Sequence, residues 1–162
     1  MSELRVGLGI DAHALADGVP LVLGGLAFDH PRGLAGHSDG DVIAHALIDA
    51  VLGAANLGDI GTMFPSGDDR WRGSSSLDLL RIAWARVREA GWELVNADCI
   101  LIGEEPRVGP HRASMAEALA GALGVAAERV AVRATTTDRL GFTGRGEGLA
   151  AEAVALLRRE SA

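Results

Sequence analysis

Three residues in the first third of the chain, Asp11, His13 and His45, have the types and spacing of a metal site. Asp11 and His13 follow an alternating apolar run. Residues i and i+2 of a strand point to the same side, so their carboxylate and imidazole can face one point. His45 would add a second nitrogen, and two nitrogens with one oxygen commonly hold a catalytic zinc whose fourth position stays open. The alternative interpretation is a strand end with polar side chains.

Polar residues around His45 allow two further functional interpretations. A ligating histidine needs a partner for its other ring nitrogen. Asp49, one helical turn later, can be that partner, or the two residues can form an exposed i,i+4 pair. His37 and Ser38 precede the same predicted helix, where backbone N–H groups favour a phosphate oxygen. Ser-Asp-Gly is also a common turn sequence, so turn formation alone would explain these residues.

The elements that position these residues follow from apolar periodicity and from glycine positions. Apolar spacing after Asp41 predicts a helix over 41–55 with Asp41 as its cap. Ser76 is predicted to cap the next helix. The expected strands cover 4–10, 94–103 and 129–135, with a hairpin over 19–28. The expected helices cover 41–55, 77–90, 110–123 and 148–159, and the expected long loops cover 33–40 and 58–75.

Strands and helices alternate only in part, and the early hairpin argues against a purely parallel sheet. We therefore expect one α+β domain over residues 1–162, a two-layer sandwich in which helices cover one face of a mixed β-sheet. The uncovered face would need a partner. One face of the strand over 129–135 is apolar, which fits a core and an interface equally.

Composition narrows the classes of function. The net charge is −7 and only 4% of residues are aromatic, with no tyrosine, which argues against nucleic acid as a partner. An acidic protein that binds phosphates must supply local positive charge, and bound metal ions often do so. The single cysteine, Cys99, lies in an apolar run typical of a buried core residue. We find no secretory signal and no apolar stretch of about 18 residues, so we expect a cytoplasmic protein without a membrane partner.

Several motifs together resemble one known family in both order and spacing. Besides the Asp-x-His motif and the His-Ser-Asp-Gly-Asp loop, they include Gly-Asp-Ile-Gly followed by Phe-Pro, Ala-Thr-Thr-Thr, and a glycine-rich run. They lie at 5–13, 37–41, 58–65, 134–137 and 140–148. The chain resembles the 2-C-methyl-D-erythritol 2,4-cyclodiphosphate synthases over roughly residues 5–157. The resemblance implies a homotrimer with sheets packed around a central axis and active sites between neighbouring subunits.

The resemblance also implies roles for particular residues. It makes Asp11, His13 and His45 the ligands of one Zn²⁺ per subunit. It implies that His37 and Thr136 stabilise the transition state, and that Asp138 holds Mg²⁺ or Mn²⁺ on the substrate diphosphate. The remaining implied substrate-binding residues are Ser38, Asp59, Ile60, Gly61, Phe64, Asp68, Thr135, Thr137, Phe142 and Arg145, with the loop over 103–109 holding the cytidine.

The chain departs from the family pattern at a few of these positions. Ser66 replaces the first aspartate of the substrate-closing loop over 64–68. Asp138 replaces a glutamate, which leaves a hard oxygen ligand one methylene shorter. Arg107 and Arg133 replace lysines near the nucleotide, which keeps the charge but changes the donor geometry.

The implied reaction converts 4-diphosphocytidyl-2-C-methyl-D-erythritol 2-phosphate into 2-C-methyl-D-erythritol 2,4-cyclodiphosphate and CMP, in the non-mevalonate route to isoprenoid precursors. Phosphoryl transfer depends mainly on positioning and charge neutralisation, which suits the residues present. Two alternatives stay open: a zinc-dependent phosphohydrolase with a nucleophilic water at the fourth zinc position, and a non-catalytic trimeric ligand-binding protein. The intact Asp11, His13 and His45 set argues against the second.

Overall fold

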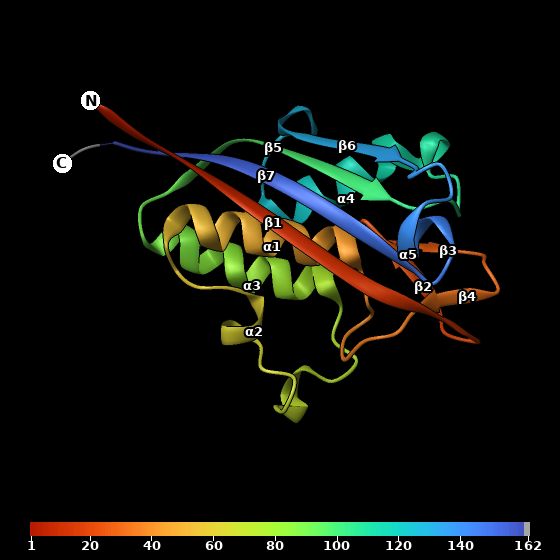
Figure 1. Cartoon of the computed structure of the whole chain (residues 1–162). Helices are drawn as coiled ribbons and strands as arrows, with labels where there is room; N and C mark the ends of the chain where they lie inside the picture. The colour runs from red at the N-terminus through yellow and green to blue at the C-terminus, as the bar shows by residue number, and fades with distance from the viewer. Residues whose placement is uncertain (161–162) are drawn as a thin grey trace.

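The computed structural model describes residues 1–160, and its centre is a five-stranded mixed sheet (Figure 1). The strand order is β4-β1-β7-β5-β6. All neighbours are antiparallel except β5 and β6, which run parallel. A separate two-stranded hairpin joins β2 (Leu21–Leu23) to β3 (Leu26–Phe28). The sheet strands are β1 (Ser2–Asp17), β4 (Arg32–Leu34), β5 (Glu93–Ile102), β6 (Val130–Thr135) and β7 (Gly148–Glu160).

Three long helices form the second layer on one face of the sheet (Figure 1): α1 (Val42–Ala55), α3 (Ser76–Glu89) and α4 (Arg112–Leu123). Helix α1 packs directly on β1 and β7, and α3 packs against α1. Gly7 and Gly9 permit this close approach, because a Cβ there would collide with the carbonyls of Ala50 and Ala46. The short helical turns are α2 (Ile60–Met63), η1 (Asp69–Trp71), η2 (Gly109–His111), η3 (Ala127–Arg129) and α5 (Gly141–Gly144).

This architecture confirms the expected α+β class and the mixed sheet, but it corrects the expected final helix. Residues 148–159 form β7, a strand paired with β1 on one side and β5 on the other. The segment is rich in Ala, Leu and Glu, which favour helices, but pairing on both edges overrides that preference. Its burial alternates: Ala151, Ala153 and Ala155 are buried, whereas Glu152 and Val154 are exposed.

Other boundaries also differ from the expectations. Strand β1 runs to Asp17, so Asp11 and His13 lie inside a strand rather than at its end. Helix α3 begins at Ser76, and its cap residue is Ser75, which makes no side-chain capping bond. The predicted long loops contain β4, α2 and η1. Pairing with β7 and β4 extends β1 to Asp17, so the local apolar pattern could not show where this strand ends.

The face of the sheet opposite the helices exposes a row of apolar side chains. Leu4, Val6, Leu8 and Ile10 alternate along β1 and are 58–68% exposed, whereas Gly7 and Gly9 between them are buried against α1. Contiguous exposed apolar surface on a folded protein commonly marks an interface. Cys99 is fully buried as expected, and burial raises the pKa of its thiol to about 12. Among residues 1–160, no helix is long and apolar enough to cross a membrane.

Candidate functional site

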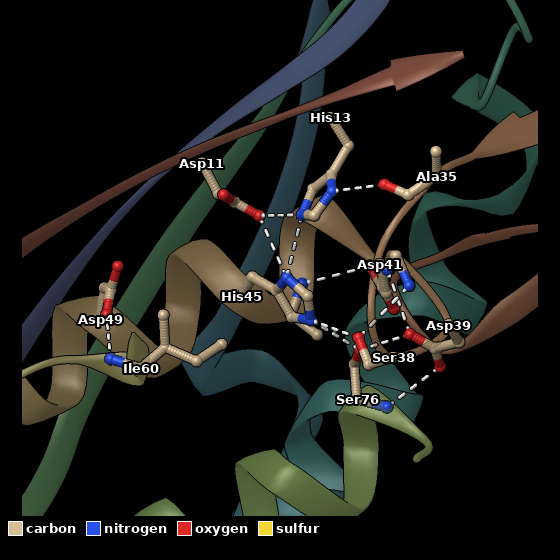
Figure 2. Close-up of polar contacts among 12 residues, drawn as sticks. Asp11, His13, Ala35, Ser38, Asp39, Asp41, His45, Asp49, Ile60 and Ser76 are labelled. Atoms are coloured by element: carbon tan, nitrogen blue, oxygen red, sulfur yellow. Dashed lines mark hydrogen bonds and ion pairs between the residues drawn. The ribbon is translucent and has the colours of Figure 1, made fainter. Parts of the chain in front are cut away.

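Asp11 and His13 from β1 meet His45 from α1 in a compact cluster (Figure 2). Asp11 Oδ2 lies 2.8 Å from His13 Nε2 and 3.1 Å from His45 Nδ1, and these two nitrogens lie 3.2 Å apart. Tetrahedral zinc, with bonds of about 2.0 Å, places its ligand atoms about 3.3 Å apart. The three side chains therefore have the spacing and the chemistry of a tetrahedral metal site with one position to spare.

Each imidazole presents one nitrogen to the cluster and has its other nitrogen fixed (Figure 2). His13 Nδ1 lies 2.8 Å from the carbonyl oxygen of Ala35, so it donates there and leaves Nε2 free to bind a metal. His45 Nε2 lies 3.0 Å from Ser38 Oγ and 2.9 Å from Ser76 Oγ. Two hydroxyl acceptors fix the tautomer that leaves His45 Nδ1 as the ligand atom.

Asp39 and Ser76 complete the hydrogen bonds that hold the His45 ring. The sequence alone had not linked either residue to His45. The Ser76 hydroxyl donates a short hydrogen bond to Asp39, which also accepts from the Ser76 N–H at 3.0 Å and the Asp41 N–H at 3.1 Å. A chain of hydrogen bonds thus runs from His45 through Ser76 to a carboxylate. No local spacing relates residues 39 and 76, so only the fold shows the connection.

Asp49 does not form a hydrogen bond with His45. The sequence had suggested that it supports a ligating His45 ring or forms an exposed i,i+4 pair with it. Its carboxylate accepts a 2.7 Å hydrogen bond from the Ile60 N–H, at the start of α2 (Figure 2). Burial and the nearby charges of Asp59 and Asp11 raise the pKa of Asp49, against the lowering effect of the Ile60 bond. Asp49 therefore anchors the loop segment that faces the metal cluster.

Asp41 is the cap of α1, as predicted, and it also fixes the hairpin. Its Oδ1 accepts from the N–H groups of Ala44 at 3.2 Å and Gly24 at 2.9 Å, and its Oδ2 accepts from Gly25 at 2.7 Å. Complete burial raises the pKa of Asp41 to about 6, although the three N–H groups oppose the shift. The carboxyl locks the β2–β3 turn to the start of α1, one turn before His45.

The electrostatics of the cluster suit a cation. Burial acts to raise the pKa of Asp11, but the hydrogen bonds and charges of His13 and His45 outweigh it and lower that pKa to about 2. The hydrogen bond to Asp11 raises the pKa of His13, against the effect of burial. Asp11 is thus ionised at neutral pH, and its negative charge favours a cation at the centre of the cluster.

A cavity of about 370 Å³ opens beside the cluster, within the range of small-molecule sites. It joins Asp11, His13 and His45 to predicted substrate-binding residues from two other segments: His37, Ser38, Ile60, Gly61 and Phe64. Trp71, which sequence reasoning did not single out, also lines it. Only the folded loop brings Trp71 to the cavity, so the sequence pattern could not indicate it.

Two predicted residues of this region are engaged elsewhere. Asp59 caps α2 by accepting the Thr62 N–H at 2.7 Å. Asp68 caps η1 and pairs with Arg70 at 2.5 Å. Neither lines the cavity, so the structure places them at its margin with their carboxylates occupied.

The remaining predicted residues lie apart from this cavity. They are Thr135, Thr136, Thr137, Asp138, Phe142 and Arg145. Asp138 is exposed with a left-handed φ of 52°, and Thr136 Oγ1 lies 3.4 Å from its Oδ1. Arg107 and Arg145 line a second cavity of about 570 Å³, whereas Arg133 pairs with Asp98 at 2.8 Å. Within one chain, the cavity beside Asp11, His13 and His45 and the predicted residues over 135–145 therefore lie apart.

Comparisons with known proteins identify the family of the chain. A model of the YgbB family matches residues 4–158. The 2-C-methyl-D-erythritol 2,4-cyclodiphosphate synthase of Rubrobacter xylanophilus is 58% identical over 162 residues, covering 98% of each chain.

Two solved structures are also similar. The bifunctional IspDF from Campylobacter jejuni superposes with a TM-score of 0.95 at 40% identity, over 99% of this chain and 44% of that longer one. A 2C-methyl-D-erythritol-2,4-cyclodiphosphate synthase in its CDP-bound form gives a TM-score of 0.86 at 40% identity, over 94% of this chain and 99% of that one. The chain therefore belongs to the YgbB family, the family of the 2-C-methyl-D-erythritol 2,4-cyclodiphosphate synthases.

Proposed function

We propose that this protein converts 4-diphosphocytidyl-2-C-methyl-D-erythritol 2-phosphate into 2-C-methyl-D-erythritol 2,4-cyclodiphosphate and CMP. The observation that carries the proposal is the Asp11, His13 and His45 cluster beside a ligand-sized cavity, in a chain that belongs to the synthase family. The 2-phosphate oxygen of the substrate attacks the β-phosphorus, the bond to the CMP oxygen breaks, and a cyclic diphosphate closes. The step belongs to the non-mevalonate route to isoprenoid precursors.

The metal of this site is Zn²⁺, one per subunit, held by Asp11, His13 and His45. A carboxylate and two imidazoles are a common donor set of catalytic zinc, and a bound zinc would polarise a phosphate oxygen there. The hydrogen bonds from His13 to Ala35 and from His45 to Ser76 orient the two rings before any metal arrives. The protein thus supplies a preformed site rather than one assembled by the ligand.

The residues around the cavity position the methylerythritol half of the substrate. His37 and Ser38 contact its phosphate, and His37 stabilises charge that develops in the transition state. Ile60 and Gly61 present backbone groups to its hydroxyls, with Asp59 at the margin. The loop from Phe64 to Asp68 closes over the site and excludes water, which favours the intramolecular attack.

The other half of the site comes from a neighbouring subunit of a homotrimer. Two features support this proposal. The outer face of β1 exposes an apolar row that requires burial, and Thr135 to Asp138, with Phe142 and Arg145, lie away from the metal cavity of their own chain. In the trimer these residues reach the diphosphate and cytidine of the adjacent site. Thr136 assists the transition state, and Asp138 would hold Mg²⁺ or Mn²⁺ on the substrate diphosphate as a hard oxygen ligand.

A zinc-dependent phosphohydrolase would use the same cluster, with water at the open metal position. Product analysis separates the two reactions. Purified protein supplied with the cytidine substrate, zinc and magnesium should give a cyclic diphosphate, in which two coupled phosphorus signals appear by ³¹P NMR, together with CMP. A linear bisphosphate as the main product would support the hydrolase, and the absence of turnover would support a non-catalytic ligand-binding protein.

A further inference from the structure

Helix α1 carries both a residue of the metal cluster and the anchor of the segment that follows the helix. Asp49 lies one helical turn after His45, and residues four apart on a helix lie on the same face. The Asp49 carboxylate accepts a hydrogen bond of 2.7 Å from the Ile60 N–H (Figure 2). The position of Ile60 is therefore tied to the helix that holds His45.

This bond is the polar link between residues 58–72 and the rest of the fold. Among residues 1–160, every other hydrogen bond or ion pair made by residues 58–72 joins neighbours in the same stretch of chain. The next link to another part of the fold is at Gly73, whose N–H donates to the His37 carbonyl at 2.8 Å. Asp49 thus holds the first half of this segment in place, where α2 begins.

The Asp49 carboxylate serves this bond alone. In the part of the chain that the structure describes, it makes no other hydrogen bond or ion pair, and it does not line the metal cavity, the one beside Asp11, His13 and His45. A carboxylate that accepts from a backbone N–H makes a charge-assisted bond, about twice as strong as a neutral one. Ile60 also packs against the core, but apolar contacts have no direction, so the hydrogen bond sets the course of the backbone.

The anchored segment forms part of the wall of the metal cavity. Ile60, Gly61 and residues 64–67 line it. Gly58, with a left-handed φ of 93°, comes just before this wall, and glycine leaves the backbone more conformations than other residues do. A wall that is fixed before the ligand arrives spares the ligand the entropic cost of ordering it. The anchor therefore contributes to ligand affinity.

We propose that Asp49 is a positioning residue that holds residues 60–67 at the metal cavity through the Ile60 N–H and so raises the affinity for the methylerythritol half of the substrate. This inference rests on the proposed function, which places that half of the substrate in this cavity. Asp49 acts through Ile60 and does not touch the ligand. The cytidine half is bound by another part of the chain, so its affinity should not depend on Asp49.

Substitutions at Asp49 separate the hydrogen bond from the charge. Asp49→Ala removes the acceptor, whereas Asp49→Asn removes the charge and keeps an oxygen that can accept from the Ile60 N–H. Asp49→Leu has a similar shape without an acceptor, and it replaces Asp49→Ala if that variant does not fold. Asp78→Ala is the matched control, because Asp78 is an exposed aspartate of α3 whose carboxylate pairs with Arg81 on the same helix.

The probes are the cyclic product 2-C-methyl-D-erythritol 2,4-cyclodiphosphate and CMP, each titrated into zinc-loaded protein. Asp49→Ala should bind the cyclic product about 10-fold more weakly, the lower end for loss of a hydrogen bond to a charged group. Asp49→Asn should lose less than about threefold, and Asp78→Ala should bind as the wild type does. CMP affinity and zinc content should not change. Without any ligand, amide hydrogen exchange over residues 58–64 should be faster in Asp49→Ala than in the wild type.

Failure of this inference differs from failure of the proposed function. Equal affinity of Asp49→Ala and the wild type for the cyclic product would overturn the inference alone, as would unchanged amide exchange over residues 58–64. An Asp49→Asn variant as weak as Asp49→Ala would assign the effect to the charge and overturn it too.

A general structural role has its own signature. Parallel loss of zinc, of CMP affinity or of the fold in Asp49→Ala and Asp49→Leu would show that Asp49 supports the whole subunit, which would also overturn the inference. A wild type that neither makes nor binds the cyclic diphosphate would overturn the proposed function and this inference with it.

Discussion

Ser76→Ala tests whether the hydrogen bonds behind His45 support metal binding. The substitution removes the hydroxyl that lies 2.9 Å from His45 Nε2 and links it to Asp39. Loss of such a partner commonly costs 10- to 100-fold in metal affinity. Ser38 Oγ remains 3.0 Å from the same nitrogen, so we expect the lower end, about a tenfold weaker zinc Kd, or about 1.4 kcal/mol.

The assay is competition for zinc between metal-free protein and a chromophoric chelator at fixed pH. Ser75→Ala is the matched control, because Ser75 is exposed, caps the same helix and makes no side-chain capping bond. It should bind zinc as the wild type does. The double substitution of Ser38 and Ser76 should weaken binding further, since His45 Nε2 then has no acceptor. A zinc Kd for Ser76→Ala within twofold of the wild type would show that the Ser76 hydroxyl does not support zinc binding.

Three further predictions follow from the site and the sheet. His45→Ala should abolish stoichiometric zinc while circular dichroism stays native, because the ligand lies at the edge of the core; full zinc occupancy by elemental analysis would contradict the assignment. Light scattering should give the wild type a mass of about three times the 16.7 kDa chain. Leu8→Glu, which places a charge on the exposed face of β1, should yield monomers. A wild-type monomer at micromolar concentration would exclude an active site shared between subunits. Asp41 has a folded pKa raised from 3.8 to about 6, so its stabilising contribution is complete below pH 3.8 and is lost as pH rises through 6. Urea titrations of the metal-free proteins at one protein concentration measure the unfolding free energy of the wild type and of Asp41→Asn at each pH. The wild-type value minus the Asp41→Asn value should fall by about 3 kcal/mol between pH 3.8 and pH 6. A difference that does not change with pH would contradict the raised pKa of Asp41.

The cluster of Asp11, His13 and His45 could be predicted because its signal is local and chemical. Strand alternation places Asp11 and His13 on one side, and the third residue, His45, belongs to a motif through which the chain resembles the family. Asp41 was likewise predictable as a cap, since a short acid before an apolar periodic run is typical of a helix start.

Features that depend on tertiary pairing could not be predicted from local patterns. The alanine-rich segment of β7 has the composition of a helix, but two neighbouring strands hold it extended. Asp39 and Ser76 support His45 from segments 37 residues apart, and Asp49 bonds to Ile60 instead of His45. Trp71 lines the cavity beside Asp11, His13 and His45 only because the fold brings its loop there.

Running the reaction in oxygen-18 water shows whether the nucleophile is the substrate's own phosphate. Intramolecular attack excludes solvent from the new bond, so the cyclic diphosphate and the CMP should both form without solvent label. Mass spectrometry of the two products measures this. A labelled linear bisphosphate, or labelled CMP, as the dominant product would instead identify water as the nucleophile.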